Sequence, residues 1–299
     1  MSQLREYIDR HQSESQRLVG LNYEQLIKLI NQAEKLNEQK QQVAEQKKAR
    51  LIKAGGGRQP KLSVSDQILL TLVYLHHLPT FQMLGVQFGI SESAANYIFH
   101  RWLGILRELL PASLVEQVKK KDFEWGWVEE ILSNVELIVD SYEQPRERPR
   151  EYQEQKKYYS GKQKRHTFKN QLIVMPTGEE IVDVVVGKPG ATSDINLWRK
   201  RRTQFSDIQK FQGDKAYVGE AAIDTPHKKT RSQDITDEQK EENRKKAKTR
   251  IVVEHLIRWV KTFRIAAERF RLNSSSYERV IRAVCGLIRW RIGAIVFNY

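Results

Sequence analysis

Three acidic residues have the types and spacing needed for metal-dependent chemistry. Asp140 directly follows the apolar, β-branched run 135–139, and Asp214 follows a second short apolar run, 208–212. The carboxyl ends of strands in an open α/β sheet meet at one cleft, so we expect both carboxylates to lie there. Mg²⁺ prefers such oxygen ligands, and a third carboxylate from a flanking helix would complete a site for two ions. Two ions can activate an attacking oxygen and stabilise the departing one in phosphoryl transfer.

The third carboxylate is expected to be Glu254, on a long helix that runs through Phe263. An apolar stripe at helical spacing predicts one buried face of this helix. The stripe consists of Val252, His255, Leu256, Trp259 and Phe263. Arg250 and Lys261 lie at i−4 and i+7 from the glutamate, on nearly the opposite side. This row suits a site where Glu254 holds metal and Arg250 or Lys261 contacts DNA phosphate.

Each of these acids also has a plainer interpretation. An Asp after a strand is usually a turn residue, and most Glu side chains on helices are solvated. Arg250 and Glu254 could form an ordinary surface salt bridge between residues i and i+4. The residues taken singly therefore leave both interpretations open.

The elements that must position these acids form a mixed α/β pattern over residues 130–299. A hairpin is predicted from strands at 166–175 and 181–186 with a turn at Thr177-Gly178. Ser193 begins a helix, and Ser275 with Glu278 opens a last helix through residue 289. The order strand, hairpin, helix, strand, helix predicts a mixed sheet in layers with helices, as in a ribonuclease H-like fold.

Residues 58–115 are predicted to form an all-α helix-turn-helix domain. Ser65, Thr80 and Ser91 can each cap a helix. The short middle helix, its stop at Gly89 and the immediate restart suit a helix-turn-helix, although a plain three-helix bundle is the alternative. The outer face of the third helix could reach bases or phosphates. Its candidate DNA-binding residues are Ser93, Asn96, Tyr97, His100 and Arg101.

Residues 1–57 are expected to be a polar helical segment ending in a glycine joint at 55–57. Asn22 with Gln25 forms a capping-box start for a helix. Its apolar residues lie near a heptad spacing that Lys40 and Lys47 interrupt. Either a weak coiled-coil contact or a helix that is solvated or packed on its own chain fits this pattern.

The composition favours a nucleic-acid partner. Lys and Arg number 51 against 37 Asp and Glu, a net charge of +14, and such an excess favours a polyanion through counterion release. The longest apolar stretch, 68–75, is too short to span a bilayer. A single cysteine, Cys285, and scattered histidines exclude a disulfide and a zinc-ligand spacing. A reducing, cytoplasmic setting is expected.

Five short motifs, in this order and spacing, carry a family resemblance. They are Val-Asp-Ser at 139–141, Tyr-Tyr-Ser-Gly-Lys at 158–162, His-Thr-Phe-Lys-Asn-Gln at 166–171, Gly-Lys-Pro-Gly-Ala-Thr-Ser-Asp at 187–194 and Gly-Asp-Lys-Ala-Tyr at 213–217. Together with Arg250, Glu254 and Lys261, this pattern resembles the DDE transposases of bacterial insertion sequences, in the branch similar to the PIF/Harbinger elements. Ala247 stands where the related signature has Tyr.

The resemblance implies a function. Asp140, Asp214 and Glu254 would coordinate two Mg²⁺ ions, with Mn²⁺ able to substitute. Water would cleave at the transposon ends, and the freed 3′-OH would attack target DNA, with Lys261 contacting phosphate near the scissile bond. The partners implied are double-stranded DNA, as terminal inverted repeats and target, and further copies of the chain in a dimer or higher multimer. Asp183 and Asp194 would be structural, Asp194 at a helix N-terminus.

Two other functions remain open from the residues. A catalytically silent, transposase-derived DNA-binding regulatory protein would keep the helix-turn-helix without the chemistry. A structure-specific nuclease would keep the metal site but would cut without joining. The presence of all three acids argues against the first of these alternatives.

Overall fold

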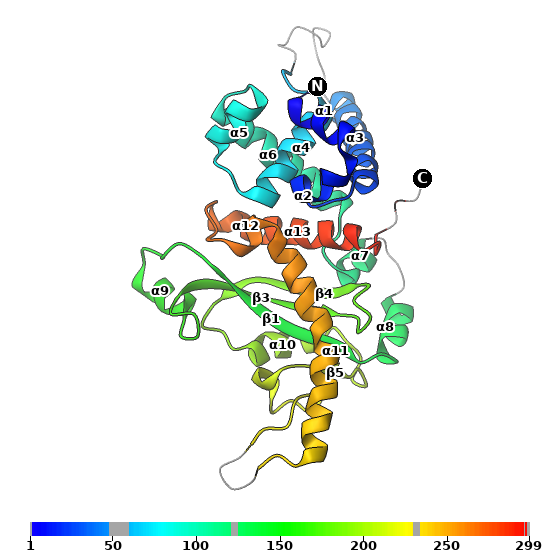
Figure 1. Cartoon of the computed structure of the whole chain (residues 1–299), viewed down its shortest axis with the longest axis vertical. Helices are drawn as coiled ribbons and strands as arrows, with labels where there is room; N and C mark the ends of the chain where they lie inside the picture. Colours follow the sequence, from blue (N-terminus) through cyan, green and yellow to red (C-terminus); the bar gives the residue numbers. More distant parts are fainter. Residues whose placement is uncertain (1, 48–59, 121–124, 230–233, 296, 298–299) are drawn as a thin grey trace. The chain divides into compact units, whose positions relative to one another are not determined.

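The computed structural model describes residues 2–47, 60–120, 125–229, 234–295 and 297. The chain divides into two compact units (Figure 1). One consists of Met1–Leu110, Phe263–Ile265 and Ile295–Tyr299, and the other of Pro111–Thr262 and Ala266–Ala294. Across the described residues, no helix is both long and apolar enough to cross a membrane.

The first unit is helical. Its elements are α1 (Gln3–Arg10), η1 (Gln12–Glu14), α2 (Ser15–Val19), α3 (Tyr23–Gln46), α4 (Val64–His77), α5 (Phe81–Phe88) and α6 (Glu92–Leu109). The predicted capping box at the start of α3 is confirmed, with Asn22 and Gln25 bonding reciprocally. Leu26, Ile30 and Ala33 are buried, so the first half of α3 packs on its own chain. The predicted glycine joint at 55–57 lies outside the described residues.

The caps of α5 and α6 agree with the predicted helix-turn-helix. The Thr80 and Ser91 side chains accept hydrogen bonds from the backbone N–H groups at the starts of these helices. Gly89 ends α5 in the left-handed conformation, at φ +66°, which glycine adopts without a Cβ penalty. The predicted cap of α4 was wrong: Ser63 rather than Ser65 caps it, because the chain turns into the helix two residues earlier.

The second unit is mixed α/β, which confirms the predicted fold class. Its strands are β1 (Leu137–Pro145), β2 (Tyr159–Ser160), β3 (Arg165–Val174), β4 (Ile181–Pro189), β5 (Phe211–Gln212) and β6 (Ile223–Asp224). Its helices are α7 (Leu114–Lys120), α8 (Trp125–Ser133), α9 (Tyr152–Tyr158), α10 (Asp194–Arg202), η2 (Lys215–Tyr217), α11 (Asp237–Thr262), η3 (Ser274–Ser276) and α13 (Tyr277–Arg291), with α12 (Arg264–Ala267) after α11. The sheet order is β2-β3-β1-β5-β6, with β4 on β3.

Strand β1 is longer than the apolar run that predicted it. It continues past Asp140 to Pro145, because β3 pairs with it antiparallel over its whole polar second half. The expectation that Asp140 ends a strand was therefore wrong. The predicted hairpin of β3 and β4 is confirmed, with Gly178 at φ +78° in its turn.

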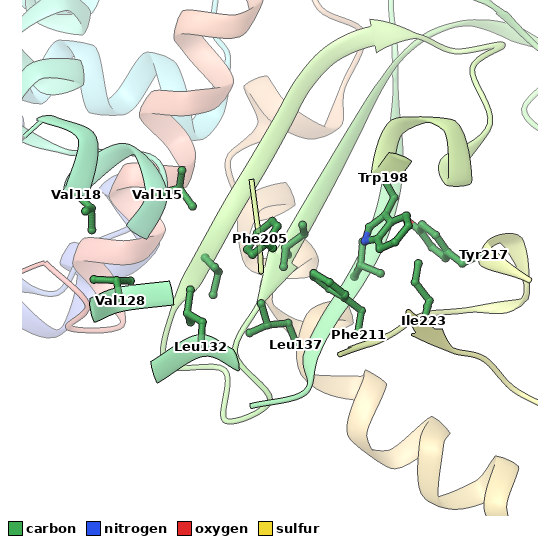
Figure 2. Packing of buried hydrophobic residues seen from close by; sticks show 13 residues of the cluster. Val115, Val118, Val128, Leu132, Leu137, Trp198, Phe205, Phe211, Tyr217 and Ile223 are labelled. Atoms are coloured by element: carbon green, nitrogen blue, oxygen red, sulfur yellow. The ribbon is translucent and has the colours of Figure 1, made fainter. Parts of the chain in front are cut away.

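Side chains of β1 alternate between two faces of the sheet. Leu137 and Val139 point into a core that includes Trp198, Phe205 and Phe211 (Figure 2). This core fills one face and is covered by α7, α8 and α10. Ile138 and Asp140 therefore lie on the other face, across which α11 runs (Figure 1).

Helix α11 buries a stripe shifted by one residue from the predicted stripe. Val253, Leu256, Ile257 and Val260 are buried, whereas His255 is exposed. The register could not be resolved from sequence because adjacent apolar residues, such as Val252 and Val253, fit two neighbouring stripes. The helix starts at Asp237, so much of the basic stretch 228–248 is helical. Helix α13 starts after Ser276, and the nearby side-chain cap is Asn273 rather than Ser275.

Candidate active site

Strand pairing brings Asp140 and Asp214 together. β1 and β5 are parallel, with Leu137 opposite Phe211 and Ile138 opposite Gln212. Asp140 and Asp214 each lie two residues beyond the last pair, and the negative charge of Asp214 raises the pKa of Asp140, so the two carboxylates lie near each other. The Asp140 carboxylate accepts the Ser141 N–H at 2.7 Å, and the Asp214 carboxylate accepts the Ala216 N–H at 2.8 Å. The sequence-based expectation that the two acids share one place is thus supported by the register.

The Asp140 carboxyl group is half-buried in a charged setting. Burial, together with the negative charges of Asp214 and Asp194, raises its pKa from 3.8 to about 6. The Ser141 hydrogen bond and the Arg250 guanidinium oppose this increase. A half-buried carboxylate beside a second one is electrostatically costly, and a divalent cation would relieve that cost.

Helix α11 places its charged row beside the sheet. Arg250, Glu254 and Lys261 are displaced by about 90° from the centre of the buried stripe, not opposite it, which corrects the predicted geometry. Lys261 lies with its Nζ 5.2 Å from the centre of the Tyr142 ring. Burial lowers the pKa of Lys261, and the Asp140 carboxylate partly opposes this. The row thus borders the face that carries Asp140.

Glu254 is engaged by its helical neighbour. Arg250 Nη2 lies 3.5 Å from Glu254 Oε1, with side-chain exposures of 19% and 56%. Arg250 Nε is buried without a hydrogen-bond partner in the described structure. Among the described residues, no three His, Cys, Asp or Glu side chains are gathered closely enough to hold a metal ion. Asp140 and Asp214 fit Mg²⁺, which commonly uses one or two carboxylates, while Glu254 as third ligand stays a prediction.

A polar cavity of about 180 Å³ adjoins these residues. Its lining comprises Ser141, Tyr142, Glu143, Lys162, Gln163, Lys169, Asp194 and Lys261. Lys169 Nζ lies 3.0 Å from Asp194 and 3.6 Å from Glu143. The sequence analysis did not assign this buried cation to the site, although Lys169 is the lysine of the His-Thr-Phe-Lys-Asn-Gln motif. The available signal was a lysine in the middle of a predicted strand, where a charged side chain is seldom buried without a partner.

Other motif residues hold the sheet around the site. Gln171 Nε2 donates to the Tyr217 hydroxyl at 2.9 Å and to the Asp194 carbonyl at 3.1 Å. On the opposite face, Asn170 donates to the Tyr277 hydroxyl at 2.8 Å. A Cβ on Gly190 would lie 2.0 Å from the Thr167 hydroxyl, so only glycine fits there. These motifs thus fix the strands that carry the acids.

Asp183 and Asp194 have the contacts of structural residues. Arg201 donates to both oxygens of the buried Asp183 carboxylate, at 2.6 and 2.7 Å. Asp194 lies in the first turn of α10, where the positive end of the helix dipole favours a carboxylate. Its ion pair with Lys169 connects that helix to β3.

The raised pKa of Asp140 predicts a pH-dependent gain in stability for Asp140→Asn. The folded chain binds this proton more tightly than the unfolded chain, so stability falls as pH rises from about 4 through about 6. At pH 7.5 without metal, Asp140→Asn should therefore be more stable by about 1–3 kcal/mol, with no gain below about pH 4. Urea unfolding in EDTA across this range measures it. The exposed Asp207→Asn is the control, and parallel pH curves for both variants would contradict the prediction.

The predicted recognition helix is α6, and its candidate residues differ in accessibility. Ser93 and Tyr97 are exposed, whereas Asn96, His100 and Arg101 are half-buried. Arg101 Nη2 donates to the buried Asn37 side chain of α3 at 2.9 Å. Arg101 therefore also connects two helices of its own unit, a role that its sequence position did not reveal.

Replacing His100 and Arg101 with alanine should weaken binding to the element's own ends more than binding to random duplex. Each lost base contact is expected to cost about 1–3 kcal/mol of discrimination. Fluorescence anisotropy with duplexes of the gene's flanking sequence and of scrambled sequence measures both affinities. Asn37→Ala is the matched control, because it removes the Arg101 anchor and keeps the guanidinium. Equal losses on both duplexes would remove α6 as the sequence-reading helix.

Comparison with known proteins gives two family matches and one close relative. Residues 139–289 match the family model described as DDE superfamily endonuclease, and residues 60–112 match the helix-turn-helix of DDE superfamily endonuclease. The chain is 32% identical over 244 residues to a probable transposase for insertion sequence element IS702 from Microchaete diplosiphon. That alignment covers 79% of this chain and 83% of the relative.

Two solved structures show weak similarity. The mariner Mos1 paired end complex with Mg matches at 14% identity and a TM-score of 0.15, over 62% of this chain and 63% of the other. A pre-cleavage Mos1 transpososome matches at 14% identity and a TM-score of 0.17, over 88% of each chain. At these TM-scores the two structures support no further statement about this chain.

Proposed function

Because this chain belongs to the DDE superfamily of endonucleases, we propose that it is the transposase of an insertion sequence. It cuts the ends of the element and joins the freed 3′-OH to target DNA. The single observation that carries this proposal is the parallel pairing of β1 with β5, which puts Asp140 and Asp214 on neighbouring segments where their charges interact. The relative's identity supports the same assignment.

The acidic residues form the metal-binding part of the proposed site. Asp140 and Asp214 would hold Mg²⁺, and Glu254 would be the third ligand when it is not paired with Arg250. Two bound ions would activate the attacking oxygen and stabilise the departing one. Asp140 must lose its proton to bind metal, so its raised pKa makes metal binding weaken below about pH 6.

The cations of α11 contact the phosphates of the DNA backbone, whereas Lys169 of the sheet does not. Lys261, whose ammonium group interacts with the Asp140 carboxylate, contacts a phosphate next to the bond that is cut. Arg250, once released from Glu254, is free to contact a second phosphate. Lys169 stays between Glu143 and Asp194 and offsets part of their negative charge.

The helix-turn-helix of the first unit recognises the terminal inverted repeats. Residues on α6 contact the major groove, and the net charge of +14 supplies much of the affinity for phosphate. Two ends must be held for joining, so the active assembly contains at least two copies of the chain.

A cleavage and joining assay tests the proposal. The full-length protein is incubated with duplex DNA carrying the gene's flanking sequences, a supercoiled target plasmid and either Mg²⁺ or EDTA. Cut ends and joined products in Mg²⁺ alone are expected. Cutting without joining would indicate a nuclease, and tight binding without any strand scission would indicate a DNA-binding regulatory protein.

A further inference from the structure

A second pocket lies in the segment between β1 and β3, on a side of the catalytic unit that the proposed mechanism does not use. Its volume is about 410 Å³, and Arg148, Gln155, Lys156, Tyr159 and His166 line it. Pockets of roughly 300–1,000 Å³ are typical for bound small organic groups. The pocket is therefore large enough for a nucleobase with its sugar.

Two aromatic rings form one wall of this pocket. Tyr159 and His166 are directly paired across the β2–β3 ladder. Their ring centroids are 5.6 Å apart at an interplanar angle of 71°, and Tyr159 is 46% exposed. Burial and the neighbouring Arg148 and Arg146 lower the pKa of His166, so its ring is uncharged at neutral pH. The ladder thus holds an uncharged ring pair open to a planar ligand.

Two cations lie at the rim of the same pocket. Arg148 Nη2 donates to Gln155 Oε1 at 2.8 Å, and Gln155 in turn donates to the carbonyls of Pro149 and Arg150. These bonds fix the guanidinium without neutralising it. Lys156 Nζ lies 4.6 Å from the centre of the Tyr152 ring and, within the described residues, has no carboxylate partner. The pocket therefore presents positive charge available to an anion.

The surrounding segment has the composition of a nucleic-acid surface. Residues 146–166 contain eight Lys and Arg against three Glu, together with three tyrosines. The same segment continues to Lys162 and Gln163, which line the cavity beside Asp194 and Lys261. One continuous basic segment thus borders both the aromatic pocket and the candidate active site.

We propose that this pocket binds one unstacked nucleotide of the DNA substrate. The base stacks on the exposed Tyr159 ring with the inclined His166 ring against its edge, and its phosphate is contacted by Arg148 and Lys156. A paired base cannot enter the recess because its complement blocks it, so the pocket selects single-stranded or unpaired positions. The inference rests on the proposed function, because it takes DNA as the substrate.

Binding of two fluorescein-labelled probes to the full-length protein in EDTA tests the proposal. The probes are a dT oligonucleotide of about 12 nucleotides and a duplex of the gene's flanking sequence. Tyr159→Ala should weaken oligonucleotide binding at least about fivefold, and Lys156→Ala should weaken it as well. Duplex binding should change by less than about twofold, since the helix-turn-helix supplies it. Tyr159→Phe keeps the ring and should bind as the wild type does.

A matched control comes from the same helix. Lys157 is paired with Glu154 at 2.6 Å and does not line the pocket, so Lys157→Ala should leave oligonucleotide binding unchanged and is the matched control for Lys156→Ala. A loss with Lys157→Ala equal to the loss with Lys156→Ala would overturn the pocket assignment. If Tyr159→Ala bound the oligonucleotide as tightly as the wild type, and the wild type still bound the duplex, the pocket assignment would be wrong and the proposed function would stand. A wild type that binds neither probe would overturn the proposed function too.

Discussion

Asp140→Asn is expected to reduce strand cleavage by at least about a thousandfold while DNA affinity stays within about twofold. The substitution removes one negative charge from the half-buried carboxylate beside Asp214, which lowers the affinity for a divalent cation. Phosphate contacts elsewhere dominate DNA affinity and are retained. Initial rates of cleavage of the flanking-sequence duplex in Mg²⁺, with parallel anisotropy measurements, check both parts.

Two further variants make this result specific. The exposed Asp207→Asn changes the same charge outside the site and should cleave at the wild-type rate. Glu254→Gln tests the third acid: a loss close to that of Asp140→Asn is expected if Glu254 leaves Arg250 to bind metal. Wild-type cleavage by Asp140→Asn would show that the metal assignment is wrong, whereas wild-type cleavage by Glu254→Gln would remove the third acid alone.

The predicted features that were confirmed depend on local chemistry. Thr80, Ser91 and Asn22 cap helices through bonds to residues three positions away, so the signal is contained within four residues. The Thr177-Gly178 turn is equally local, because glycine supplies the positive φ that the hairpin needs. Such features could be predicted without knowing what packs on them.

Two larger features that were wrong, the extent of β1 and the buried face of α11, depend on distant partners. The polar second half of β1, from Asp140 to Pro145, does not have the sequence of a core strand, and its extension is set by pairing with β3. Ladder hydrogen bonds thus outweighed local composition. The one-residue shift of the α11 stripe has a similar cause, because the sheet decides which of two adjacent apolar rows is buried.

The candidate site was predicted only in part, because some of its contacts also depend on residues distant in sequence. Asp140 and Asp214 each follow a segment that was predicted as a strand, and the parallel pairing of those strands brings the two acids near each other. The ion pairs of Lys169 with Glu143 and Asp194 join three elements distant in sequence, so no spacing rule could indicate them. Glu254 pairs with Arg250, as the plainer interpretation of their i, i+4 spacing predicts, and its role as a metal ligand stays a prediction.

Arg289→Met is expected to cause the largest loss of stability among the substitutions considered, about 3–5 kcal/mol. Arg289 on α13 has an exposed fraction of 0%. Its Nε and Nη2 each donate to Glu180 at 2.6 Å, Nη1 donates to the Pro111 carbonyl at 2.9 Å, and Nη2 also donates to Gln117 at 3.0 Å. Methionine fills much of the volume but leaves these acceptors and the Glu180 charge without their partner.

Urea unfolding at pH 7.5 measures this loss, with Arg244→Met as the control. Arg244 pairs with Glu241 in an exposed position on α11, where an ion pair contributes at most about 1 kcal/mol. The double variant Arg289→Met/Glu180→Gln should recover part of the loss, because it removes the unpaired buried charge as well as its partner. If Arg289→Met and Arg244→Met unfolded at the same urea concentration, the bidentate pair would not be what holds α13 against the β3–β4 turn. The stability recovered by the double variant measures the cost of leaving Glu180 without a partner. The loss that remains is due to packing and to the other hydrogen bonds of Arg289, which Glu180→Gln does not restore.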